Sequence, residues 1–272
     1  MPNARIISDN AAERVTLTAT TASGYPASNL LNDDKSLTAR STGTSWTLTG
    51  TTATTETAAS VHLPFCNLSP TATIRVRLYS DTAGLTLARD TGAILACPAP
   101  ARKLRGWTDA QAASAYFNGG GARARVWFAS TAWRKFVIDI SDVSNLQGYI
   151  EAARLIVGPY WSPTYNASAA PLATVDSTTL YRNAAGGQMA DAGTIHRKMS
   201  VDFSMMPPDD RATFANLLLQ SRAYPLLISV FPENADASLE RDYTIYGRRT
   251  ENSEVAIAYA GAYGPKIPVE EV

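Results

Sequence analysis

The chain has 272 residues, of which 45% are hydrophobic and 18% charged, a composition typical of globular proteins. This length is enough for two cores of ordinary size or one large all-β domain. Its 24 Lys and Arg residues balance its 24 Asp and Glu residues, so no long-range field favours nucleic acid or an anionic membrane. No apolar run approaches the roughly 20 residues that cross a bilayer, and the N-terminus "MPNARIISDN" lacks the apolar core of a signal peptide, so we expect the protein to stay in the cytosol that makes it.

Residues 1 to about 60 are rich in Thr, Ser and Ala. Because the branched Cβ of Thr favours extended backbone, we interpret this region as short strands joined by polar loops. Within it, "GYPASNLLNDDKS" is typical of a loop held to a core by Leu30 and Leu31. Asp33 and Asp34 in this loop are either solvated turn residues, which we favour, or ligands of a calcium ion.

Residues 61 to 160 alternate apolar and polar side chains with the period of a β-strand. In "TATIRVRLYS" the apolar face is Ile74, Val76 and Leu78. The stretches "ARARVWFAS" and "RKFVIDISD" repeat the pattern, and the first places Arg123, Arg125 and Trp127 on the opposite side from Val126 and Phe128. The three glycines of "FNGGGARAR" indicate a turn, because a phosphate-binding loop would need Lys-Ser or Lys-Thr and a helix after them.

The small, polar stretch "SPTYNASAAPLATVDSTT" has the composition of a link between domains. After it, "HRKMSVDFSM" predicts a strand with four apolar side chains on one face: Met199, Val201, Phe203 and Met205.

The stretch "PPDDRATFANLLLQSRAYP" predicts one helix, with prolines at its start and Asp209 and Asp210 in its first turn, where the helix dipole favours them. Its apolar face is Phe214, Leu217 and Leu218, which we expect to pack on a sheet that includes "SVDFSMM". Three strands, "YPLLISVFPEN", "DYTIYGRR" and "EVAIAYAGAY", complete a small α+β unit.

Reactive residues form no pattern that indicates catalysis. His62 and His196 are the only histidines, lie in different regions, and have no nucleophile elbow such as G-x-S-x-G. Cys66 and Cys97 are too few for a disulfide framework or a zinc site, so we expect reduced core thiols, with a single bridge between them as the alternative. We therefore expect no enzymatic activity, no cofactor and no metal.

Aromatic side chains form the sharpest candidate site. Tyr160, Trp161 and Tyr165 lie in "GPYWSPTY", and Trp107 could join them. Exposed Trp and Tyr rings offer flat platforms for the apolar face of a sugar, which predicts a carbohydrate-binding site at these four residues. The alternative, which we favour, is that the rings cap the end of a sandwich or seal a domain junction.

Three stretches, "ASNLLNDDKSLTARSTGTSWTLT", "VHLPFCNLSPTATIRVRLYSD" and "FVIDISDVSNLQGYIEAARLIVGPYWSPTYN", resemble the galactose-binding-like β-sandwich of phage tail modules. The C-terminal run "RKMSVDFSMMPPDDRATFANLL…YPLLISVFPEN…YGRR…IPVEEV" resembles the segment that follows this sandwich in siphophage-type tails. The resemblance implies a mainly β fold, with a jelly-roll sandwich over residues 1–165 and a smaller tail-tube-like α+β domain over 166–272. It also implies that Glu151 to Val157 is a strand, with Leu155 and Val157 facing one way and Arg154 and Ile156 the other.

The function that the resemblance implies is a distal tail protein, which links the tail tube to the baseplate in the virion tail after assembly in the host bacterial cytoplasm. The expected partners are copies of the chain in a ring of about six, the tail tube protein, the baseplate hub, and a tail fibre or receptor-binding protein. The alternative is a glycan-binding module that recognises host surface polysaccharide. Neither alternative involves nucleic acid or a membrane.

Overall fold

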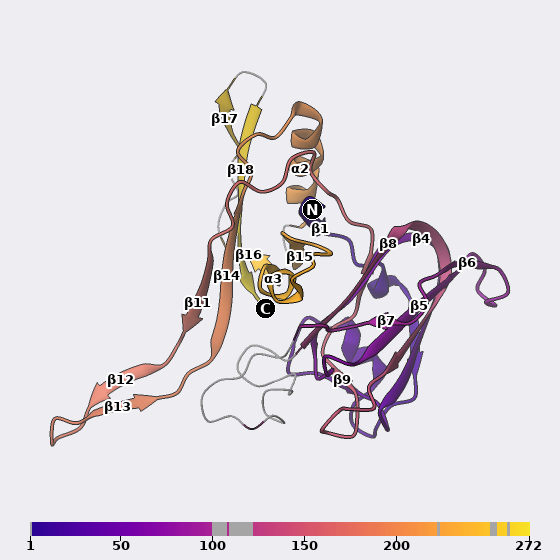
Figure 1. Ribbon diagram of the computed structural model, residues 1–272, viewed down its shortest axis with the longest axis horizontal. Helices are drawn as coiled ribbons and strands as arrows, with labels where there is room; N and C mark the ends of the chain where they lie inside the picture. The colour runs from indigo at the N-terminus through magenta and orange to yellow at the C-terminus, as the bar shows by residue number, and fades with distance from the viewer. Residues whose placement is uncertain (1, 100–107, 109–121, 222–223, 251–254, 260–261) are drawn as a thin grey trace.

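The computed structural model describes residues 2–99, 108, 122–221, 224–250, 255–259 and 262–272. The strands in these ranges form a 9-stranded sheet, a 7-stranded sheet and a two-stranded ribbon (Figure 1). The mainly β class predicted from the sequence is confirmed. No helix within the described ranges combines the length and the apolar character needed to cross a bilayer.

The 9-stranded sheet, called the sandwich below, comes from the N-terminal part of the chain, together with two 3-10 helices. Its elements are η1 (Ala11–Arg14), β2 (Thr16–Ala19), η2 (Ala27–Leu31), β3 (Ala39–Arg40), β4 (Ser45–Cys66), β5 (Thr73–Tyr79), β6 (Leu87–Asp90), β7 (Ile94–Leu95), β8 (Ala122–Ser141), β9 (Glu151–Ala152) and β10 (Ile156–Gly158).

The long strands β4 and β8 pair antiparallel along most of their length and organise the sandwich. The register shifts between Thr51 and Glu56 and again between Ala58 and Ser60, and such irregularities let a sheet bend over itself. The bent sheet encloses one core, in which the Trp133 and Phe136 rings meet edge to face with centroids 5.3 Å apart. The predicted N-terminal β-sandwich is therefore confirmed.

The alternation predicted for the sandwich strands is present. Ile74, Val76 and Leu78 of β5 point into the core, while Arg77 of the same strand pairs with Asp139 on the outer surface. The predicted loop around Leu30 is held as expected, because that side chain is fully buried in the sandwich core.

The predicted strand from Glu151 to Val157 is divided in two. Strand β9 ends at Ala152, where it lies between β3 and β4 with Ala152 opposite Cys66, and β10 begins at Ile156 opposite His62 of β4. The predicted facing is confirmed for the second part: Leu155 and Val157 lie in the sandwich core, and Ile156 packs in a separate cluster outside it.

The second sheet has seven strands in the order β1-β15-β16-β18-β14-β11, with β17 paired to β18, and this sheet together with two helices is called the second unit below. Its elements are β1 (Arg5–Ile7), β11 (Leu172–Asp176), β14 (Ile195–Asp202), α2 (Pro208–Gln220), β15 (Leu226–Ser229), α3 (Ala237–Asp242), β16 (Thr244–Arg249), β17 (Val255–Tyr259) and β18 (Ala262–Glu271).

Helix α2 confirms the helix predicted from the sequence, with Pro208 at its start and the two acidic residues in its first turn. Phe214 and Leu217 are buried against Val201 and Ile267 of the second sheet, as the apolar face predicts. Helix α3 was not predicted, because its six residues are too few for a periodic pattern. The residue that marks the start of α3 is Asp236, which caps the helix: its side chain accepts hydrogen bonds from the Ser238 and Leu239 amides.

The prediction for Met205 was wrong. Its side chain is 56% exposed, whereas the neighbouring Met206 is buried in the core of the second sheet. The alternation fails because β14 ends at Asp202, and the chain then turns before Met206 pairs with Tyr263 as an isolated bridge.

One segment crosses the expected boundary at residue 165, and another occupies part of the expected link. Strand β1 pairs with β15, so the start of the chain lies in the second sheet rather than with the sandwich. Strand β11 lies inside the stretch expected to be a link, and it pairs with β14. Three residues of β1 carry too little pattern to show which sheet edge they join. The division at residue 165 stays a prediction about folding units.

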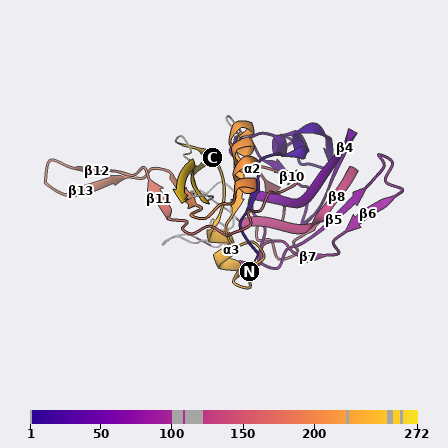
Figure 2. The same ribbon diagram turned by 90° about the horizontal axis from the view of Figure 1, so that it is seen from above.

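A two-stranded ribbon extends from the body of the molecule beyond β11 and β14 (Figures 1 and 2). It consists of β12 (Thr179–Arg182), β13 (Gln188–Asp191) and the turn between them, and we call residues 179–191 the arm. Every residue of the arm is exposed.

Candidate functional site at the junction of the two sheets

The predicted aromatic residues do not form one platform. Trp161 packs against Phe203 and Phe214, with ring centroids 6.5 and 6.0 Å away, and so belongs to the core of the second sheet. Tyr160 turns the other way and packs against the outside of the sandwich. Tyr165 is 60% exposed, and the remaining member of the predicted set, Trp107, lies outside the described residues.

Tyr160 belongs to a cluster of rings between the sandwich and the second sheet, a region called the junction below. The Trp127 and Tyr160 rings meet edge to face with centroids 5.4 Å apart, and the Arg5 guanidinium lies over both, 4.7 and 4.5 Å from their centroids. Arg5 also donates to Glu233 at 2.6 Å, and the His62 ring packs edge to face against Trp127 at 4.4 Å. Because Arg5 comes from β1 and Trp127 from β8, this cluster ties the first strand of the chain to the sandwich.

Two buried carboxylates of the second unit bind arginines at the junction. Glu240 is 1% exposed and accepts from Arg125 Nε at 2.8 Å and from Trp127 Nε1 at 2.9 Å. Glu271 accepts from Arg123 of the sandwich and from Arg197 of β14, the latter at 3.0 Å. Buried charges are tolerated when they are paired and hydrogen-bonded in this way.

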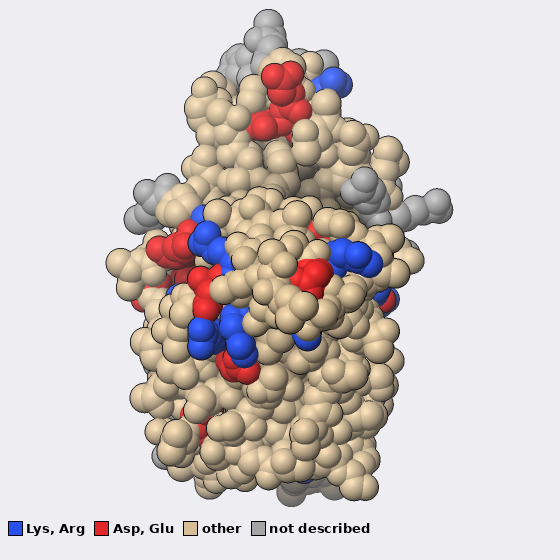
Figure 3. Space-filling model, turned by 90° about the vertical axis from the view of Figure 1, so that its right-hand side faces the viewer, with Lys and Arg blue, Asp and Glu red and all other residues tan. Residues whose placement is uncertain are grey.

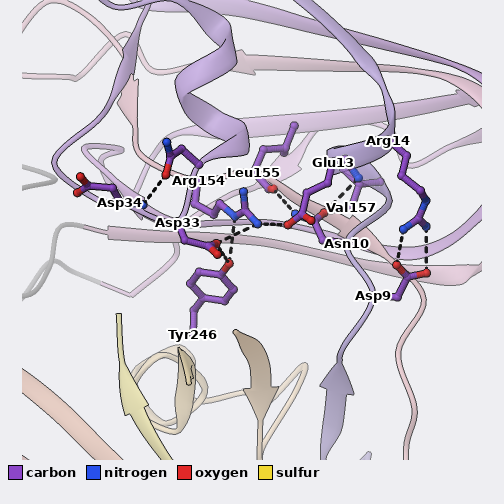
Figure 4. A network of polar contacts seen from close by, with 12 residues as sticks. Asp9, Asn10, Glu13, Arg14, Asp33, Asp34, Arg154, Leu155, Val157 and Tyr246 are labelled. Carbon is purple, nitrogen blue, oxygen red and sulfur yellow. Dashed lines mark hydrogen bonds and ion pairs between the residues drawn. The ribbon is translucent and has the colours of Figure 1, made fainter. Parts of the chain in front are cut away.

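A third network surrounds Arg154, which is 2% exposed (Figure 4). Its Nε donates to the Tyr246 hydroxyl at 3.0 Å, and its Nη2 lies 3.0 Å from Asp33 and also donates to Glu13. The Tyr246 hydroxyl donates to Asp33 at 2.6 Å. Burial raises the pKa of Tyr246 above its usual range, so the phenol stays protonated and remains a donor.

A cleft of about 400 Å³ opens beside this network. Its lining includes Asp9, Glu13, Arg14 and Arg154, with Tyr224 on the side of the second unit. Arg14 bridges Asp9 at 2.6 Å and Glu56 at 2.8 Å, so acidic and basic groups in the lining neutralise one another. On the face of the molecule shown in Figure 3, acidic and basic side chains mix in a band across the middle, and a further acidic group lies near the top.

The two acidic loop residues have different roles. Asp33, expected to be a solvated turn residue, instead binds Arg154 and Tyr246 across the junction, so the calcium alternative has no support at this carboxylate. Asp34 fits the turn interpretation: it accepts from the Ser36 amide at 2.9 Å, and hydrogen bonds from Ser36 lower its pKa. Within the described ranges no group of three His, Cys, Asp or Glu residues could hold a metal ion.

The two histidines lie on different sheets, and the two cysteines lie side by side. His62 is 2% exposed, and burial, with Arg125 and Arg5 nearby, lowers its pKa to about 3, so it is neutral. His196 lies on the second sheet with its Nε2 2.7 Å from Glu270. Cys66 and Cys97 are buried free thiols, as expected, with their sulfur atoms 4.0 Å apart.

Sequence reasoning missed Arg5, Arg154, Glu240, Glu271 and Tyr246 as junction residues. One signal was available: the large polar face of β8, formed by Arg123, Arg125 and Trp127, is unusual for a surface that only meets water, and its partners are the missed glutamates. The junction as built can hold two units together through buried ion pairs.

No protein-family model matches the chain, and no curated protein matches it. Similar solved structures include the CBM32 of AlyQ in complex with 4,5-unsaturated mannuronic acid, with 16% identity, a TM-score of 0.35, and coverage of 52% of this chain and 92% of that one. A chitosan-binding module of a Paenibacillus chitosanase/glucanase has 12% identity and a TM-score of 0.37, over 55% of this chain and 98% of that one. A Ruminococcus gnavus GH29 fucosidase in complex with fucose has 12% identity and a TM-score of 0.40, over 57% of this chain and 27% of that one. These values are too low to transfer a ligand or an activity.

Proposed function

We propose that this chain is a structural subunit of an assembly built from many copies, in which the arm binds a neighbouring copy. The observation that carries the proposal is the arm itself, a two-stranded ribbon that leaves the body with every residue exposed. A two-stranded hairpin is at best marginally stable alone in water, so the arm needs a surface to lie on.

The arm carries apolar side chains on both faces. Tyr181 and Met189 are cross-strand partners and lie on one face, 52% and 45% exposed. Leu180, 60% exposed, lies opposite Ala190 on the other face. Exposed Tyr, Met and Leu side chains on a protruding ribbon are typical of a surface that another protein covers. Arg182 and Asp191 are its charged residues, so like charges do not oppose contact between copies.

The assembly that we propose is a phage tail tip or baseplate, with the chain acting as a distal tail protein in the virion. This identity rests on the sequence resemblance described above. The second unit would form the ring, about six copies on that family's pattern, and bind the tail tube protein and the baseplate hub. The sandwich would face outward and support a fibre or receptor-binding protein.

The test is the oligomeric state of the purified protein measured by sedimentation velocity. We expect the wild-type chain to form a closed multimer of the 29.1 kDa subunit, and the double variant Tyr181→Asp/Met189→Asp to sediment as a monomer. The matched control is Leu85→Asp, which places the same charge on an exposed leucine of the sandwich and should leave the multimer intact. A wild-type monomer at all concentrations, or an arm variant that assembles like the wild type, would refute the proposal.

A second candidate is a glycan-binding adsorption module. It is favoured by Tyr165, the exposed member of the predicted aromatic set, and the similar structures named above include modules described with mannuronic acid and chitosan. The variants to test are Tyr165→Ala and Trp107→Ala on a glycan array. Trp161→Ala is unsuitable, because that ring is packed in the core of the second sheet. Binding that disappears in either variant would support this candidate, and an array without binding would remove it.

A further inference from the structure

The two cysteines of the chain meet in the sandwich core although they lie 31 positions apart. Their sulfur atoms are 4.0 Å apart, and both residues are at most 2% exposed. A disulfide has its sulfur atoms about 2.05 Å apart, so each sulfur would need to move by about 1 Å, which rotation about χ1 and small backbone adjustments can supply.

Both cysteines are held against the same strand, β8. Cys66 ends β4, where it pairs with Ala122, and its thiol donates to the Ala122 carbonyl at 3.2 Å. Cys97 follows Ala96, whose carbonyl accepts from the Arg125 amide at 3.2 Å. Because Ala122 and Arg125 lie three residues apart on one strand, the backbone keeps the two thiols in contact.

The two thiols have different acidities. Burial acts to raise the pKa of Cys66, but the hydrogen bond with Cys97 and backbone hydrogen bonds hold it below its usual value. Burial raises the pKa of Cys97 above its usual value. The thiolate is the nucleophile in thiol oxidation, so Cys66 would react first.

We propose that Cys66 and Cys97 are a redox-sensitive pair that a small peroxide converts into a disulfide. The Cys66 thiolate attacks one oxygen of hydrogen peroxide, the O–O bond breaks, and hydroxide leaves as Cys66 becomes a sulfenic acid. The Cys97 sulfur then attacks the Cys66 sulfur, the S–S bond forms, the S–O bond breaks, and hydroxide takes the thiol proton to leave as water. In sum, two thiols and one peroxide give one disulfide and two waters.

The bridge would fasten the end of β4 to the chain that follows β7. It would close a loop that contains β5, β6 and β7, and closing such a loop lowers the entropy of the unfolded chain. Under the proposed function, a protein assembled in a reducing cytoplasm would lock after release into an oxidising medium, and this consequence rests on that function. The pairing of the thiols does not depend on it.

The experiment treats the full-length protein with hydrogen peroxide under native conditions, then denatures it and alkylates the remaining thiols. We expect both thiols to disappear together, non-reducing peptide mapping to recover a Cys66–Cys97 disulfide, and the melting temperature to rise by roughly 5 °C or more until a reductant reverses it. The single variants Cys66→Ser and Cys97→Ser are the controls, because neither can form the bridge and neither should gain stability.

Two results would overturn the proposal: two free thiols after peroxide treatment, or oxidation of each cysteine to sulfinic or sulfonic acid without a bridge. Oligomeric state is measured on the same samples. A bridge in a chain that stays monomeric would support the redox pair and contradict the proposed structural function, so the two can fail separately.

Discussion

The ion pair between Arg125 and Glu240 gives the most direct test of how the two units are held together. Glu240 is 1% exposed, and its carboxylate accepts both Arg125 Nε and Trp127 Nε1. The variant Glu240→Ala would leave the Arg125 guanidinium without its carboxylate in a largely desolvated junction.

The magnitude follows from burial. Removing one partner of a fully buried ion pair costs about 3–5 kcal/mol. The Arg125 side chain is 23% exposed, so solvent recovers part of its hydration, and we expect a loss of roughly 2–3 kcal/mol. The double variant Arg125→Ala/Glu240→Ala should lose less than the sum of the single losses, with a coupling energy of about 2 kcal/mol.

The assay is urea unfolding followed by far-UV circular dichroism, with the four proteins of the double-mutant cycle measured at one pH. The matched control is Arg75 and Asp90, an ion pair of the same chemistry on the sandwich surface, with side chains 45% and 26% exposed. Its coupling energy should be much smaller than that of Arg125 and Glu240, because solvent screens an exposed pair. A coupling energy for Arg125 and Glu240 no larger than that of the control would refute the view that buried charges hold the junction.

Three further outcomes are expected. Phe214→Ala should lower the free energy of unfolding by about 3–5 kcal/mol, because it removes the buried ring between α2 and the second sheet and leaves a cavity. An unchanged urea midpoint would contradict that packing. Folding lowers the pKa of His62 to about 3 from an unfolded value near 6.5, so the unfolded chain binds an extra proton and stability falls as the pH drops from 6.5 towards 3. In urea titrations, His62→Phe should remove roughly 2–3 kcal/mol of the stability loss between pH 6.5 and 4.5. The same dependence of stability on pH in both proteins would disprove the assignment. Trp161→Ala should lower the melting temperature by several degrees, because its ring packs on the core of the second sheet, while Tyr165→Ala leaves it unchanged. Equal effects would contradict the packing of Trp161 and the exposure of Tyr165.

Much of the local structure follows from the sequence alone. The alternation along β5 and β8 depends only on the period of a pleated strand. The sequence therefore predicts on which face of its strand Ile74 or Phe136 lies, without knowledge of which strands pair with it. Helix α2 is similarly local, since its proline, its acidic first turn and its apolar face lie within one stretch. The burial of Leu30 follows from two leucines in an otherwise polar loop.

The tertiary structure decided what the aromatic and charged residues do. Tyr160 and Trp161 are neighbours in the chain, yet alternation sends one ring to the junction and the other to the core of the second sheet. Which sheet β1 joins depends on the free edge of β15, and the role of Asp33 depends on Tyr246 far along the chain. Strand period and helix caps are set by a few adjacent residues. The environment of a charge or a ring is set by segments that meet only after folding, so the sequence shows which side chains are available and the fold shows what they contact.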